Sequence, residues 1–168
     1  MRRLKGCLPI RTRKQIYYSL VHSSINYGIL VWGSCGVTFM NRLVNLQRKL
    51  VTMLSSSDES LSSFQSARVL SVDEIYNFNL GQLMYRILDG SYHEPLTDMV
   101  SVNQIEHGHE TRFKTGKNLR GLYCRTTRAQ QSAIYRASQN WNSIPVNIRS
   151  AESLPNFKCR YKRYLLGI

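Results

Sequence analysis

The chain has 168 residues, of which 42% are hydrophobic and 20% are charged. This composition supports a packed core and excludes a disordered chain, and no apolar run approaches the ~20 residues of a membrane-spanning helix. The 23 Lys and Arg exceed the 10 Asp and Glu and give a formal net charge of +13, which indicates a polyanionic partner.

The charge is divided into blocks along the chain. Residues 1–50 hold nine basic and no acidic residues, residues 51–110 hold two basic and nine acidic ones, and residues 111–168 hold twelve basic and one acidic. Two basic blocks therefore flank an acidic one, as expected of a protein with two phosphate-binding regions. A solvated, arginine-rich surface without a partner is the alternative.

The first predicted helix spans residues 13–32. Thr12 and Gln15 are spaced as a capping box, and Gly33 is suited to end the helix. We expect one inward stripe and a second apolar row beside it: Ile16, Leu20, Tyr27 and Val31, then Tyr17, Val21 and Gly28.

A second predicted helix spans residues 38–54. Its expected inward residues are Leu43, Leu46, Leu50 and Met53, and its expected polar side is Arg42, Gln47, Arg48 and Lys49. A serine-rich stretch and a short helix through Leu61, Phe64 and Ala67 follow.

The third long helix is predicted from a capping box at Ser71–Glu74 to Leu88, with Gly90 after its end. Its expected inward residues are Tyr76, Leu80, Leu83 and Ile87, flanked by Met84 and Leu88. Three amphipathic helices in this part of the chain favour a small helical bundle over residues 1–90.

Residues 91–126 carry few periodic apolar side chains, and we interpret them as an irregular connection with at most a short β-hairpin at 111–125. A capping box at Thr127–Gln130 predicts a helix to Trp141, which Pro145 prevents from continuing. Ser153 caps a last helix with Leu154, Phe157, Tyr161 and Leu165 inward. The predicted fold class is therefore mainly α, with a bundle, a connection and a basic helical tail over 127–168.

The residues that carry catalytic chemistry are sparse. Asp58-Glu59 and Asp73-Glu74 are expected in first turns of helices, where they complement the dipole, and no pair of aspartates has the setting of a two-metal site. His107 and His109 lie in a predicted loop. We therefore expect no enzymatic activity, metal or cofactor in this chain by itself.

The four cysteines, Cys7, Cys35, Cys124 and Cys159, are too widely spaced for a zinc pattern, and no signal peptide precedes them. Reduced, mostly buried thiols in an intracellular protein are expected.

Basic residues interleaved with aromatic ones are the positive signal, because guanidinium groups hold phosphates and aromatic faces stack on unpaired bases. This pattern runs from Arg112 through Arg120, Tyr123, Arg125, Arg128, Tyr135 and Arg136 to the cluster at 158–164. Trp141 is expected in the core instead.

Four segments, in this order, resemble the part of non-LTR retrotransposon reverse transcriptases, especially jockey-like elements, that follows the catalytic palm. They are Ile16–Gly33 with its Tyr-Gly and Val-Trp-Gly pairs, Leu43–Leu54, Leu70–Gly90, and a set of tail motifs. The tail motifs are His109-Glu-Thr-Arg112, Cys124-Arg-Thr126, Trp141-Asn-Ser-Ile-Pro145, Ile148-Arg149, and Ser153 through Lys158.

The resemblance implies a thumb that grips the template–primer duplex, followed by a tail that adds contacts to RNA or DNA. The palm, the fingers and the Mg²⁺ of such a polymerase are not implied for this chain, so Met1 is expected to lie within a longer parent frame. An active parent element implies nucleus and cytoplasm. The implied nucleic-acid-binding residues are Arg11, Arg13, Lys14, Arg42, Arg48, Lys49, Arg112, Arg125, Arg128, Arg136, Lys158, Arg160, Lys162 and Arg163.

Two other functions stay open. The chain could act as a stand-alone nucleic-acid-binding protein derived from such an element. It could also be a basic amphipathic module for an anionic membrane or an acidic protein, which ranks last because the apolar stripes are expected to pack internally.

Overall fold

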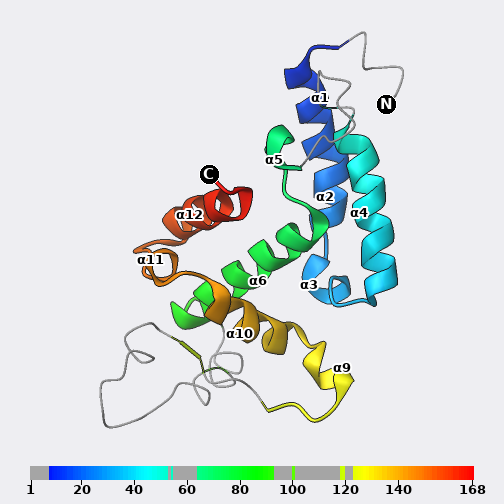
Figure 1. The fold of residues 1–168 in the computed structure, drawn as a ribbon. Helices are drawn as coiled ribbons and strands as arrows, with labels where there is room; N and C mark the ends of the chain where they lie inside the picture. The colour runs from blue at the N-terminus through cyan, green and yellow to red at the C-terminus, as the bar shows by residue number, and fades with distance from the viewer. Residues whose placement is uncertain (1–7, 53, 55–63, 93–99, 101–117, 120–122) are drawn as a thin grey trace. The chain divides into compact units, whose positions relative to one another are not determined.

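The computed structural model describes residues 8–52, 54, 64–92, 100, 118–119 and 123–168 (Figure 1). The chain is mainly helical, which confirms the predicted fold class. It divides into two compact units, residues 1–76 with 165–168, and residues 77–164. The boundary between these units falls within one helix, whereas the sequence indicated a boundary near residue 90.

The first helix begins earlier than predicted. α1 spans Ile10–Ile16, and Pro9, in an extended conformation, occupies the position before it. The amide of Arg13 donates to the Pro9 carbonyl at 3.1 Å, so Thr12 lies inside the helix and the predicted capping box there is wrong. Proline suits this position because its fixed φ fits a helix start and its missing N–H would find no partner there.

The helix then changes its winding. η2, Tyr17–His22, is a π-helical segment, and α2, Ser23–Asn26, continues from it. The Ser23 amide donates to the Tyr18 carbonyl, five residues earlier. The wider turn rotates every later side chain relative to a regular helix, so the predicted inward stripe is wrong beyond this point. Tyr17 is buried, but Leu20, Tyr27 and Val31 are 62%, 85% and 84% exposed.

Gly28 ends the predicted single helix. Its φ of 61° lies in the left-handed region, and the short helix α3, Ile29–Trp32, starts after it. The Trp32 indole N–H donates to the Tyr27 carbonyl at 2.8 Å, so a side chain satisfies a carbonyl freed by the break. Glycine adopts this conformation without the steric penalty of other residues.

α4 spans Val37–Val51, and its inward face differs from the prediction. Met40, Gln47 and Val51 are buried, whereas Leu46 is 57% exposed. Gln47 was predicted on the polar side but is 1% exposed. Its Nε2 donates to the Tyr17 hydroxyl and to the Leu70 carbonyl, both at 2.8 Å, and its Oε1 accepts from the Val72 amide at 2.9 Å. A buried amide is stable here because all three bonds are made.

The core of the first unit surrounds this glutamine. Tyr17, Val51, Leu54, Ala67 and Val69 form one buried cluster, with Val21 and Phe64 packed against it. The short helix α5, Phe64–Ala67, lies where a short helix was predicted. Met53 and Leu61, which were assigned to apolar faces, lie outside the described residues.

α6, Val72–Leu88, agrees with the sequence at both ends. The Ser71 amide donates to Glu74 Oε2 at 2.7 Å and the Glu74 amide donates to Ser71 Oγ at 3.3 Å, which confirms the capping box. At the other end Gly90 has a φ of 73°. The amides of Gly90 and Ser91 donate to the carbonyls of Ile87 and Arg86, the pattern of a Schellman motif.

The second unit packs α10, α11 and α12 with the later part of α6. α9, Thr127–Gln130, and α10, Ala133–Ser143, are separate helices capped by the hydroxyls of Thr126 and Ser132. The predicted single helix with a capping box at Thr127 is therefore wrong, because Ser132 offers a second cap. α11, Val146–Arg149, follows Pro145, and α12 spans Leu154–Leu166. The predicted hairpin at 111–125 falls mostly outside the described residues.

Closely packed aromatic rings form the core of the second unit. Phe157 lies 4.9 Å from Tyr85, 5.5 Å from Tyr161 and 5.9 Å from Trp141, measured between ring centroids. Trp141 is buried, as predicted, and so are Phe157 and Tyr161. A Cβ on Gly81 would lie 2.7 Å from Tyr161 Cε1, so glycine at this position lets α6 and α12 approach closely.

Burial makes the second unit sensitive to high pH. It raises the pKa of Tyr161 to about 12 from 10.0, and its hydroxyl contacts Asn140 Oδ1 and the Asn77 carbonyl at 3.2 and 3.4 Å. The folded state holds this proton more tightly than the unfolded state, so we expect the free energy of unfolding to fall as the pH rises from about 10 to about 12. Urea unfolding across this range checks it, and Tyr161→Phe should flatten the fall. An equally steep fall in that variant would contradict the assignment.

Candidate nucleic-acid interface

The basic residues predicted to bind phosphate in the first unit lie on α1 and α4. Arg11 is exposed, and Arg13 and Lys14 are half-buried at the last turn of α1. On α4, Arg42, Arg48 and Lys49 are all exposed. Most of these six basic residues are therefore accessible to solvent. The predicted polar side of α4, however, also included Gln47, which is buried.

Neighbouring side chains orient two of the α4 cations. Arg48 Nη1 donates to Asn45 Oδ1 at 2.9 Å. The guanidinium carbon of Arg42 lies 5.9 Å from the centroid of the Phe39 ring, in cation–π contact. Phe39 is 61% exposed. Phe39 was not among the predicted binding residues, although its spacing of one turn from Arg42 was a usable signal.

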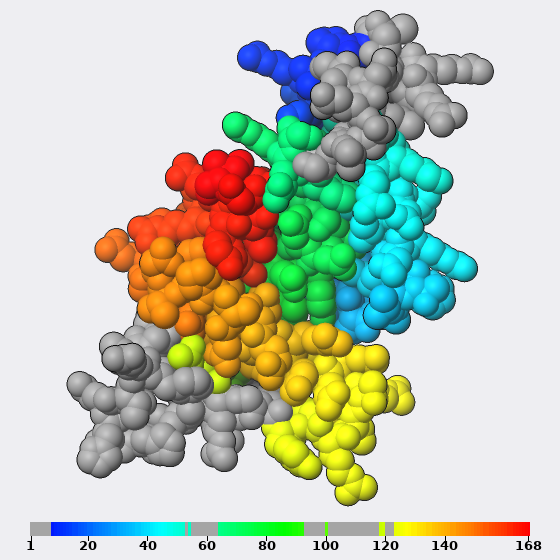
Figure 2. Space-filling model, in the orientation of Figure 1, coloured from blue at the N-terminus to red at the C-terminus, as the bar shows by residue number. Residues whose placement is uncertain are grey.

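The basic residues of the second unit are also at the surface. Arg125, Arg128 and Arg136, at and near α9 and α10, are exposed. On α12, Lys158 is half-buried, and Arg160, Lys162 and Arg163 are exposed. Figure 2 shows that the atoms of α10, α11 and α12 adjoin one another at the surface. Arg160 of α12 is held against α11, because its Nη1 donates to the Asn147 carbonyl at 3.1 Å. Arg112 lies outside the described residues.

Acidic side chains are rare in the described helices that carry these cations. Of the helices that the structure describes, only α6 contains Asp or Glu. Asp73 and Glu74 lie in its first turn, as predicted. Among the described residues of the second unit, only Asp89 and Glu152 are acidic. The faces of α4 and α12 that point to solvent therefore carry positive charge without an acidic residue in either helix.

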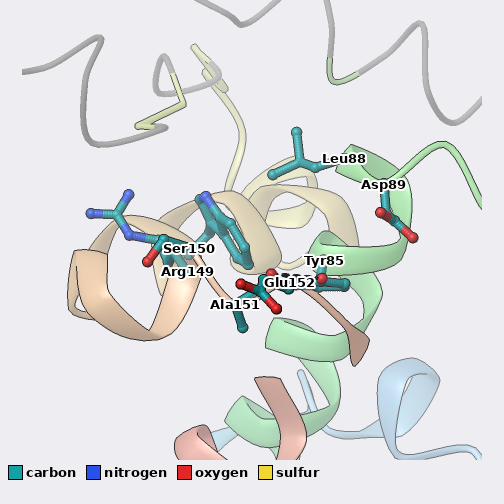
Figure 3. A pocket seen from close by; sticks show the side chains of 8 residues that line it. Tyr85, Leu88, Asp89, Arg149, Ser150, Ala151 and Glu152 are labelled. Carbon is teal, nitrogen blue, oxygen red and sulfur yellow. Dashed lines mark hydrogen bonds between the residues drawn. The ribbon is translucent and has the colours of Figure 1, made fainter. Parts of the chain in front are cut away.

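A pocket of about 260 Å³ in the second unit holds both of these carboxylates. It is lined by Tyr85, Leu88, Asp89, Trp141, Arg149, Ser150, Ala151 and Glu152 (Figure 3). The Arg149 guanidinium points away from Asp89 and Glu152, and its Nη1 donates to Asn118 Oδ1 at 2.6 Å. Burial lowers the pKa of Arg149. The carboxylates make this pocket unsuited to phosphate.

The described residues contain no group of three or more His, Cys, Asp or Glu that could hold a metal ion. His107 and His109 lie outside that part of the chain. Cys35 and Cys159 are exposed free thiols and Cys124 is half-buried, so the prediction of mostly buried cysteines is wrong. None of the described helices has the length and hydropathy to cross a membrane.

Comparison of the chain with protein-family models, with curated proteins and with solved structures finds no significant match.

Proposed function

We propose that this chain binds nucleic acid through the basic faces of its helices and represents the thumb and tail of a non-LTR retrotransposon reverse transcriptase without the polymerase site. The resemblance in four ordered segments supports the origin. In this proposal the partners are a template–primer duplex or element RNA, together with the palm and fingers of the parent polymerase, which would supply Mg²⁺.

One observation carries the binding proposal. The solvent faces of α4 and α12 present arginine and lysine, and neither helix contains an acidic residue. Like charges along one helix face repel one another, and a phosphate backbone relieves that repulsion while it releases counterions. Exposed arginines also match phosphate oxygens in a bidentate geometry.

The proposal predicts binding that weakens steeply with salt. Affinity for a primer–template duplex, measured by fluorescence anisotropy, should fall linearly on a log–log plot between low and physiological salt. Replacing Arg48→Ala with Lys49→Ala should weaken binding and reduce the slope by about 2, since each lost phosphate contact removes about 0.9. Both side chains are exposed, so the variant should keep its fold.

A matched control separates charge from helix damage. Thr38→Ala with Asn41→Ala changes two exposed, uncharged positions of the same helix and should leave both affinity and slope unchanged. A wild-type affinity that does not respond to salt would overturn the proposal.

A second candidate rests on the exposed apolar residues of the first unit. The apolar stripe of residues 16–31 was expected to pack internally, but Leu20, Tyr27 and Val31 face solvent. Exposed apolar side chains on a basic protein are typical of a surface for an anionic membrane or an acidic protein. Anionic vesicles are therefore the competing ligand in the same salt titration, and tighter binding to vesicles than to the duplex would favour this candidate.

A further inference from the structure

The solvent face of α4 carries a stripe that mixes apolar and basic side chains. Phe39, Arg42, Leu46 and Lys49 follow one another at steps of three, four and three residues, which places them along one line of the helix. Met40, Gln47 and Val51 occupy the buried side. Phe39 and Leu46 are 61% and 57% exposed, so neither is needed to complete the core behind them. We call these four residues the α4 stripe.

The ring and the cation at one end of the stripe are already arranged as a stacking platform. The Arg42 guanidinium carbon lies 5.9 Å from the Phe39 centroid, so the cation covers part of the ring and restricts the position of the ring. The exposed fraction of Phe39 leaves aromatic surface open to a further planar group. A nucleobase can stack on an aromatic face or on a guanidinium plane.

The basic residue at the other end complements this platform. Lys49 lies ten residues from Phe39, about 15 Å along the helix at 1.5 Å per residue. α4 contains no acidic residue that would repel a phosphate chain along this distance. The α4 stripe therefore offers a stacking surface at Phe39 and a cation at Lys49. Arg42 can stack on a base or attract a phosphate.

We propose that the α4 stripe binds single-stranded nucleic acid, with one unpaired base stacked on Phe39 and Arg42 and the sugar–phosphate backbone following the helix to Lys49. The internal bases of a duplex are stacked on both faces and cannot offer a free face to Phe39, so the stacking contact favours single strands. The inference rests on the proposed function: a duplex can also use the phosphate contacts of α4, and the α4 stripe adds a stacking contact that an unpaired base makes.

The test compares two substitutions of Phe39 in the full chain. The ligands are a labelled single strand of about 12 nucleotides, within the usual site sizes, and a blunt duplex of the same length. Phe39→Leu keeps an apolar side chain but removes the π face, and should weaken single-strand binding about tenfold while leaving duplex affinity unchanged. Phe39→Trp enlarges the π face and should keep or tighten single-strand binding.

The control is Val37→Ala, because Val37 is an apolar residue of the same helix and, at 75% exposed, more accessible than Phe39, and it should change neither affinity. Far-ultraviolet circular dichroism verifies that each variant is folded. If the wild type binds neither ligand in a salt-dependent way, the proposed function itself fails. If the wild type binds but Phe39→Leu leaves single-strand affinity unchanged, or weakens both ligands equally, only the stacking inference is overturned. The stacking inference is also overturned if Phe39→Leu abolishes binding to anionic vesicles while its affinity for the single strand is unchanged.

Discussion

Replacing Gln47 by leucine is expected to destabilise the protein by about 3 kcal/mol or more. Leucine removes three hydrogen bonds and leaves the Val72 amide and the Leu70 carbonyl buried without their partner. Each unsatisfied buried group costs about 1–3 kcal/mol. Since a domain of this size is stable by only about 5–15 kcal/mol, the variant should unfold at a much lower urea concentration. Tryptophan fluorescence during urea unfolding measures the change.

The adjacent Leu46 supplies the control for this experiment. Leu46 is exposed where Gln47 is buried, so Leu46→Gln should alter stability by less than about 0.5 kcal/mol, as surface changes usually do. A Gln47→Leu variant as stable as the wild type would show that Gln47 does not join α4 to η2 and to the start of α6.

Replacing Phe157 by alanine is expected to destabilise the protein by about 3–5 kcal/mol, the usual range for a buried phenylalanine. The Phe157 side chain is fully buried and its ring lies within 6 Å of three other aromatic rings. Its loss leaves a cavity among rings that are held by hydrogen bonds and cannot readily collapse. The Tyr85 hydroxyl, for example, donates to the Ala151 carbonyl at 2.9 Å.

Thermal unfolding followed by near-ultraviolet circular dichroism measures this effect, because that signal reports on packed aromatic side chains. Phe157→Leu should lose less stability than Phe157→Ala, since it refills part of the cavity. Arg163→Ala, on the exposed side of the same helix, should change stability little. A loss below about 1 kcal/mol for Phe157→Ala would contradict the central position of this ring.

The parts of the fold that could be predicted from sequence depend on local interactions. The limits of α6 follow from a capping box and a glycine that act within a few residues of each end. The inward side chains Phe157 and Tyr161 follow from the regular repeat of an uninterrupted helix.

The capping boxes at Thr12 and Thr127 were wrong because neighbouring residues, Pro9, Thr126 and Ser132, precede the helices instead. Two other predictions were wrong because they depend on partners distant in the chain or on a change of helix geometry. Gln47 reads as a polar surface residue unless its partners Tyr17, Leu70 and Val72 are known. The π-helical turn at 17–22 rotates the side chains that follow it, and no residue in that segment marks the extra width of the turn. The assignment of Gln47 and the apolar stripe after residue 17 both concern the first unit.

The candidate interface was more predictable than the packing behind it. Arginine and lysine are rarely buried, so their presence in the sequence indicates exposure without knowledge of the fold. Among the Arg and Lys residues that the structure describes, Arg149 is the buried exception at 5% exposed, and its contact with Asn118 could not be derived from spacing. The exposure of Phe39 was harder to predict, because a phenylalanine in an amphipathic helix is usually a core residue and the one signal for it was the spacing of one turn from Arg42.

Both ends of α6 are capped, and this affects how its backbone becomes accessible to water. Its first and last turns are held by side-chain and backbone bonds, so the helix has no loose end from which to fray. Val72 and Ile75 are buried in one compact unit, and Leu80 and Met84 are buried in the other. Any fluctuation that exposes the backbone of α6 to solvent must also disrupt one of the two packed cores. We therefore expect its amide protons to exchange with water only when one of these cores opens, more slowly than those of the short helices α3, α9 and α11.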